Sequence, residues 1–207
     1  FRKKPLLEIM HQILNEELHL KNLLENDEGK SYDTDPFTIF ALINRSIKIE
    51  TKIAIVDALK QHLAIEAEGP KGFTGLPEMH YSHIRFFVFG EHPPEIPKLW
   101  ELFEAAIRYA DSPSAETRDN FKTSYDAAAS AATKWMLPMG LFWIRPETFL
   151  SLDKNNKEFI QKFGITSREI QKINNADQYL AIIGDFNEYL KNEVLNLLFF
   201  GFSTPKK

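Results

Sequence analysis

The sequence contains no cysteine. The lack of thiols excludes disulfides, thiolate zinc sites, iron–sulfur clusters and cysteine nucleophiles. The chain has only nine isolated glycines, and neither the phosphate-binding pattern GxxxxGK[ST] nor the dinucleotide-binding pattern GxGxxG occurs. The patterns GxSxG and HExxH, typical of α/β-hydrolases and zinc proteases, are missing as well. We therefore predict that this chain is not an enzyme and carries no cofactor.

Long apolar runs and a large charge of one sign are also missing. No run approaches the roughly 20 apolar residues that a membrane-spanning helix needs. The basic residues of the opening segment 1–5 are not followed by the apolar stretch of a signal peptide. Lys and Arg number 25 against 29 Asp and Glu, which gives a net charge of −4 at pH 7. We expect a cytoplasmic protein with no membrane partner and no overall basic field for nucleic acid.

Helical spacing of apolar residues runs through most of the chain. It predicts seven helices, over 6–24, 36–44, 49–63, 96–110, 114–132, a short one from Thr166, and 179–197. Asp35 followed by Pro36 is a helix-start signal, and Thr166 with Glu169 has the spacing of a capping box. A composition of 43% hydrophobic and 26% charged residues is typical of globular domains. We predict one mainly α-helical domain of about seven helices over residues 1–207.

Residues 67–97 interrupt this pattern with clustered glycine and proline. Their only strand-like run is 84–89, so we predict an irregular excursion of the same domain with one short hairpin at most. His80 and His83 have a spacing found in metal sites, but no further ligand follows at a recognisable distance along the chain. We predict no metal site here.

Charge is distributed unevenly along the chain. Residues 91–126 hold 4 basic and 8 acidic side chains, whereas residues 127–207 hold 10 basic and 8 acidic ones. A local basic face can attract DNA even when the net charge is negative. The candidate DNA-contacting residues are basic, amide or aromatic side chains of this last part: Lys134, Trp143, Arg145, Lys154, Asn155, Lys157, Lys162, Arg168 and Lys172. The basic ones would contact phosphates rather than specify sequence. A mixed, solvated surface is the alternative reading of the same residues.

Three segments together resemble motifs of a known family. Residues 35–45 read DPFTIFALINR, residues 99–106 read LWELFEAA, and residues 140–153 read GLFWIRPETFLSLD. In this order they are similar to the DPFTFF-x-x-FNR, LW-x-LFE-x-A and GLFWIRP-x-x-FLSLD motifs of the N-terminal region of McrB-like proteins. Those proteins are the GTP-dependent AAA+ motor subunits of modified-cytosine restriction systems, which serve in phage defence. The resemblance covers about residues 30–165.

The resemblance implies a non-catalytic DNA-targeting module at the front of such a motor. The chain begins with Phe rather than Met, so we expect a piece of a longer protein. The motor, with its GTP and Mg²⁺, would follow in the same chain, and a McrC-like nuclease would be a partner. No individual site residue is carried over from the family. The alternative is a protein-interaction or assembly module of the same motor without DNA binding, with the acidic helices of 91–126 as its docking face.

Overall fold

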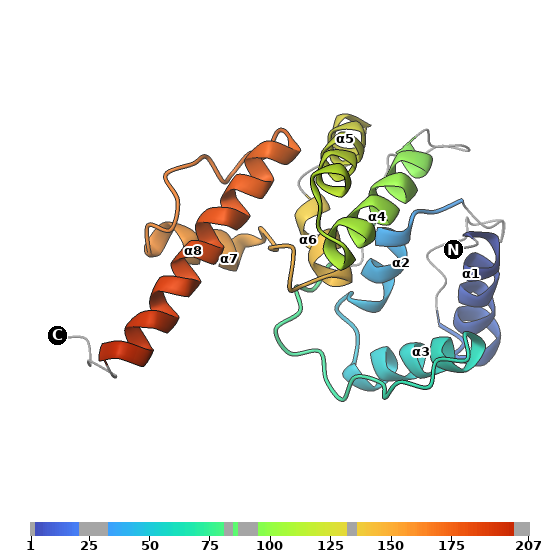
Figure 1. Ribbon diagram of the computed structural model, residues 1–207. Helices are drawn as coiled ribbons and strands as arrows, with labels where there is room; N and C mark the ends of the chain where they lie inside the picture. Colours follow the sequence, from blue (N-terminus) through green and yellow to red (C-terminus); the bar gives the residue numbers. More distant parts are fainter. Residues whose placement is uncertain (1–2, 21–32, 81–84, 87–94, 132–135, 201–207) are drawn as a thin grey trace. The chain divides into compact units, whose positions relative to one another are not determined.

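A computed structural model describes residues 3–20, 33–80, 85–86, 95–131 and 136–200 of the 207-residue chain (Figure 1). These ranges contain eight α-helices, one π-helical segment and no β-strand, which confirms the mainly α prediction. The helices are α1 (Lys3–His11), the π-helix η1 (Gln12–Glu17), α2 (Pro36–Ile43), α3 (Ile49–His62), α4 (Glu95–Asp111), α5 (Ala115–Ala131), α6 (Leu137–Ile144), α7 (Lys154–Lys162) and α8 (Ala176–Phe200).

The chain forms two compact units. Unit 1 comprises residues 1–104 and 131–133, and unit 2 comprises residues 105–130 and 134–207, so the boundary falls within α4. This division does not test the expectation of a single domain over residues 1–207, because one domain can contain two compact units.

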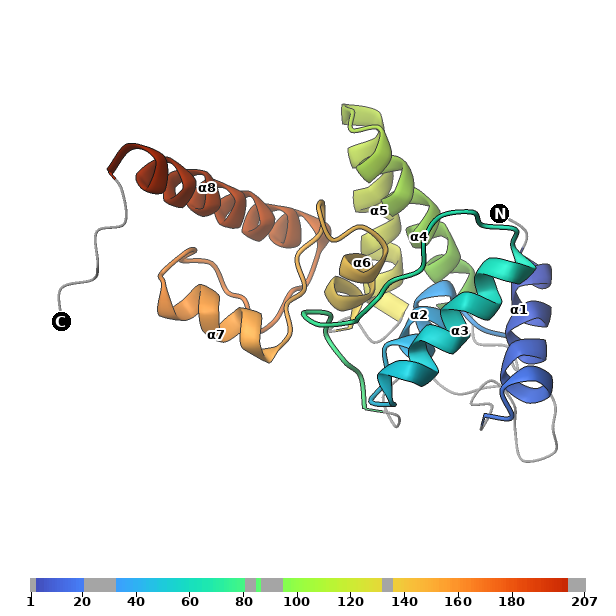
Figure 2. The ribbon, with the colours of Figure 1, turned by 90° about the horizontal axis from the view of Figure 1, so that it is seen from below.

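The core of unit 1 is built around the start of α2. Asp35 caps this helix by accepting a hydrogen bond from the backbone N–H of Thr38 at 3.0 Å, and Pro36 occupies the first helical position, as predicted. Phe37 is fully buried and stacks on Phe86 at 5.5 Å between ring centroids. It also meets Phe103 of α4 edge-on at 6.1 Å. Figure 2 shows α3 running beside α2, and α3 also contacts α1.

The excursion after α3 is irregular wherever it is described. In residues 65–80 and 85–86 the one β-type pairing is an isolated bridge between Arg45 and Met79. The buried Lys52 of α3 forms an ion pair with Glu78 beside this bridge. Most of the strand-like run 84–89, together with His83, lies outside the described residues. The expected hairpin therefore stays a prediction.

The core of unit 2 is a set of stacked aromatic rings. Phe121 of α5 stacks on Tyr109 of α4 at 5.4 Å and on Phe149 at 5.2 Å. Tyr125 of α5 stacks on Tyr179 of α8 at 5.5 Å. These contacts tie the end of α4, α5, α8 and the connection after α6 into one core.

The helices differ from the sequence prediction in four places. The first helix changes to π geometry at Gln12 and ends at Glu17, where the prediction extends it to residue 24. No helix follows Thr166, and residues 165–175 are irregular. The Thr166 hydroxyl accepts the backbone N–H of Arg168 at 3.1 Å and donates to the Asp185 carboxylate at 2.6 Å. The second half of the expected capping box does not form, because the Glu169 carboxylate accepts the backbone N–H of Gln171 at 2.6 Å. The structure also has α6 and α7, neither of which is among the seven predicted helices.

The buried cap of α2 makes the stability of the protein pH-dependent. Complete burial raises the pKa of Asp35 from 3.8 to about 6, although hydrogen bonds from Thr38 oppose this shift. Between these pH values the folded state keeps a proton that the unfolded chain releases, so the free energy of unfolding falls as the pH rises.

We predict that Asp35→Asn abolishes this pH dependence. Asparagine still caps a helix, and its amide imitates the protonated carboxyl. Between pH 4 and 7, ionisation of Asp35 should lower the free energy of unfolding of the wild type by roughly 2–3 kcal/mol. The variant should not show this loss. Urea unfolding at several pH values in this range measures the slope of the free energy of unfolding against pH. The neighbouring exposed Asp33→Asn should keep the wild-type slope, and an equal loss of slope in both variants would contradict the assignment.

Candidate nucleic-acid interface

The side chain of Asp153 fixes where α7 begins. One carboxylate oxygen accepts the backbone N–H groups of Asn155 at 2.9 Å and Asn156 at 3.1 Å. The other oxygen accepts the hydroxyl of Ser151 at 2.8 Å and the side-chain amide of Asn156 at 3.1 Å. Asp153 therefore satisfies two of the free N–H groups at the helix start and orients the helix that carries three of the seven predicted basic residues.

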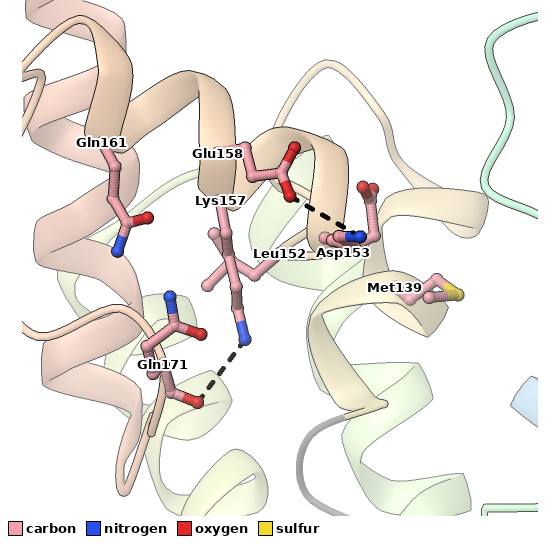
Figure 3. Close-up of a pocket in the computed structure, with 8 residues that line it drawn as sticks. Met139, Leu152, Asp153, Lys157, Glu158, Gln161 and Gln171 are labelled. Carbon is pink, nitrogen blue, oxygen red and sulfur yellow. Dashed lines mark hydrogen bonds and ion pairs between the residues drawn. The ribbon is translucent and has the colours of Figure 1, made fainter.

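A cleft of about 420 Å³ lies along one side of α7. It is lined by Met139, Leu152, Asp153, Lys154, Lys157, Glu158, Gln161 and Gln171 (Figure 3). The Lys157 amine donates to the backbone carbonyl of Gln171 at 3.5 Å, and the Lys154 amine lies 3.8 Å from the Glu158 carboxylate. Helical geometry places Lys154, Lys157 and Gln161 on the same face, because they are three to four residues apart.

Exposed aromatic rings lie next to the lysines, on the side of α7 that adjoins α8. Phe159 and Phe163 are 41% and 48% exposed, and their ring centroids are 4.6 Å apart. Tyr189 of α8 lies within 6.4 Å of Phe159 and 6.3 Å of Phe163. The Lys162 amine lies 5.5 Å from the centroid of the Phe163 ring. We refer to Phe159, Phe163 and Tyr189 as the aromatic patch.

Most of the predicted DNA-contacting residues lie on or next to α7. Lys154, Asn155 and Lys162 are exposed on the helix, and Lys157 is half-buried in the cleft. Lys172 is exposed and follows Gln171, to which Lys157 is bonded. Lys134 lies outside the described residues. The structure thus brings together four lysines that are separated by up to 18 positions in sequence.

Three predicted residues are engaged elsewhere. Trp143 is only 9% exposed, so in this structure its ring has no face open to a base. Arg145 binds both oxygens of Asp111, at 2.8 and 2.9 Å. This bidentate contact lowers the pKa of Asp111 and raises the pKa of Arg145. Arg168 donates to Asp185 at 2.9 Å. The prediction that Trp143 stacks on a base is therefore not supported by its position, and both arginines already have carboxylate partners.

Sequence reasoning missed the amides of the cleft and the aromatic patch. Gln161 and Gln171 line the cleft, but single glutamines carry no recognisable motif. Phe159 and Phe163 could have been found, because with Asp153 as a helix start their spacing places them beside Lys162 on the solvent face. Neither phenylalanine was a candidate, because a phenylalanine in a helical domain is usually buried.

In the part of the chain that the structure describes, no helix is both long enough and apolar enough to cross a membrane. Within the same residues, no group of three histidine, aspartate or glutamate side chains is arranged to hold a metal ion.

The chain belongs to a protein family described as a domain of unknown function, DUF8425, whose family model matches residues 1–204. No curated protein and no solved structure matches the chain. The family match extends over both compact units.

We predict that Asp153→Ala destabilises unit 2, because the first N–H groups of α7 lose their acceptor. The free energy of unfolding should fall by about 1–2 kcal/mol, and Asp153→Asn should cost less because one acceptor oxygen remains. Urea unfolding followed by circular dichroism measures both changes. Asp119→Ala removes an exposed carboxylate of α5 and should cost under about 0.5 kcal/mol. A cost as small for Asp153→Ala would contradict the capping role.

Proposed function

We propose that this DUF8425 protein is a non-catalytic DNA-targeting module of a McrB-like, GTP-dependent restriction motor, and that it contacts DNA through α7. The observation that carries the DNA contact is the composition of this helix. Its nine residues include three lysines, two asparagines and one carboxylate, that of Glu158. A helix with this excess of amines suits the phosphate backbone, whose neutralisation releases counterions and supplies most non-specific affinity for DNA.

The proposed contact surface consists of Lys154, Asn155, Lys157, Lys162 and Lys172. Lys154 is 87% exposed, and its contact with Glu158 at 3.8 Å is a surface ion pair of the kind worth under about 1 kcal/mol. A phosphate can therefore replace the carboxylate at little cost. In the described residues, Lys162 and Lys172 form no ion pair. Arg145 and Arg168 are left out of this surface, because each would have to exchange a closely held carboxylate for a phosphate.

The resemblance to McrB-like proteins supports the identity of the motor rather than the site. Its motifs supply the Asp35 cap, the buried Phe103 and the buried Trp143, all of which are parts of the core. Shared core residues support a shared fold. On that basis we propose that a GTP- and Mg²⁺-dependent AAA+ motor follows in the same chain, that a McrC-like nuclease is its partner, and that the protein works in the cytoplasm.

A second candidate is an assembly module of the same motor. It is favoured by the exposed carboxylates of α5, Glu116, Asp119 and Asp126, which could meet basic residues of a partner. Asp126 also accepts the backbone N–H of Ala176 at the start of α8, at 2.7 Å, so part of this acidic face has a structural role. Capture of the motor or the nuclease without any affinity for DNA would support this alternative.

We predict that the protein binds duplex DNA in a salt-dependent manner and that the α7 lysines control this binding. The logarithm of the association constant should fall linearly with the logarithm of the salt concentration. Replacing Lys154 and Lys157 together by glutamine should weaken binding and make this slope shallower by about 2, since each lysine neutralises about one phosphate. Fluorescence anisotropy with a labelled duplex, modified or unmodified at cytosine, measures both quantities.

The matched control replaces two exposed lysines of unit 1, Lys48 and Lys71, by glutamine. Lys71 also lies close to a carboxylate, that of Glu68 at 3.5 Å, and so imitates the situation of Lys154. This variant should keep the wild-type slope. If both variants lose affinity for DNA and salt dependence equally, the contact lies elsewhere than α7. No binding to either duplex at about 50 mM salt would reject targeting of duplex DNA.

A further inference from the structure

The aromatic patch is unusual because its large rings are exposed on the surface, next to lysines. Large apolar side chains are normally buried, yet Phe159 and Phe163 leave 41% and 48% of their surface exposed. They are adjacent on α7, with ring centroids 4.6 Å apart, and Tyr189 supports both from α8. Figures 1 and 2 both show α7 alongside α8. The rings are therefore held in place by a neighbouring helix while part of their surface faces solvent.

The rings have an amine beside them, together with two exposed carboxylates, Glu158 next to Phe159 and Glu188 next to Tyr189. The Lys162 amine lies 5.5 Å from the centroid of the Phe163 ring. On a helix of 3.6 residues per turn, Asn155, Phe159 and Lys162 fall on one side. On the neighbouring α8, the carboxylate of Asp185 already binds Thr166 and Arg168. A group that stacks on Phe163 would thus meet an amine at the ring and further lysines along the same helix.

We propose that the aromatic patch stacks on unpaired bases, so that the DNA this protein recognises contains a single-stranded or unstacked segment. Proteins that bind single strands combine amines that follow the backbone with aromatic rings on which bases stack. Both elements occur together on α7: Phe159 and Phe163 supply the rings, and Lys162 meets the phosphate next to a stacked base. A fully paired duplex can reach the lysines but leaves no base face for the rings. This inference rests on the proposed DNA contact and adds the class of DNA that is bound.

The test compares a labelled oligothymidine of about 20 nucleotides, enough to span a single-strand binding site, with a duplex of the same length. The wild-type 207-residue chain should bind the single strand more tightly than the duplex. Phe163→Leu keeps an apolar side chain but removes the ring, and it should raise the Kd for the single strand about tenfold. Its Kd for the duplex should stay within about twofold, because the lysines are intact. Phe159→Leu is a second variant with the same expectation.

Ile65→Ala is the matched control, since Ile65 is an exposed apolar residue of unit 1 at 47%. It should change neither Kd, and unchanged circular dichroism should show that all variants are folded. Duplex binding as tight as single-strand binding, or equal losses for both DNAs in Phe163→Leu, would overturn the base-stacking role while the proposed DNA contact stands. A wild type that binds neither DNA would fail the proposed function itself. If Phe163→Leu instead converts a dimer to a monomer in light scattering without changing either Kd, a second copy covers the patch and the inference is wrong.

Discussion

The stacked rings in the core of unit 2 are the constraint on which the candidate site depends. Phe149 and Tyr179 stack on rings from α5, and the Tyr179 hydroxyl donates to the carbonyl of Leu150 at 2.8 Å. These contacts fix the chain immediately before Asp153. Such aromatic pairs contribute about 0.5–1.5 kcal/mol each beyond the burial of their area. Because Asp153 then caps α7 from a fixed position, the rings of the core determine where the surface lysines stand.

The most distinctive motifs of this sequence and the segment that we propose to bind DNA are different parts of the chain. The tryptophan- and phenylalanine-rich motifs become core: Trp143 is buried, and Trp100 donates its indole N–H to the carbonyl of Thr34 at 3.0 Å. The segment after them has a plain composition of lysine, asparagine and glutamine, and it forms the cleft. A core imposes narrow requirements on size and shape, so it leaves a distinctive sequence. A phosphate-binding surface needs only amines that can reach the backbone, and many sequences meet that need.

The helices with a strong apolar stripe could be predicted from the sequence, and so could the cap at Asp35. Two helices are missing from the prediction, α6 and α7. Pro138 and Gly140 interrupt the apolar run of α6, and the single buried apolar residue of α7, Ile160, gives no periodicity. At Thr166 the capping pattern is present in the sequence, but the Glu169 carboxylate accepts the backbone N–H of Gln171, so the capping box does not form. The lysines were predicted as a group, whereas the carboxylate partners of Arg145 and Arg168 depend on tertiary contacts that sequence spacing does not encode.

The central claim is that DNA meets this protein at α7. A titration of the ¹⁵N-labelled protein with a short duplex, followed by NMR, tests it residue by residue. Chemical-shift changes should concentrate in the backbone amides of Asp153–Phe163 and in those of Gln171 and Lys172, while the amides of α2 and α3 stay in place. Changes confined to unit 1 or to α5, or none at DNA concentrations that saturate binding, would contradict the claim.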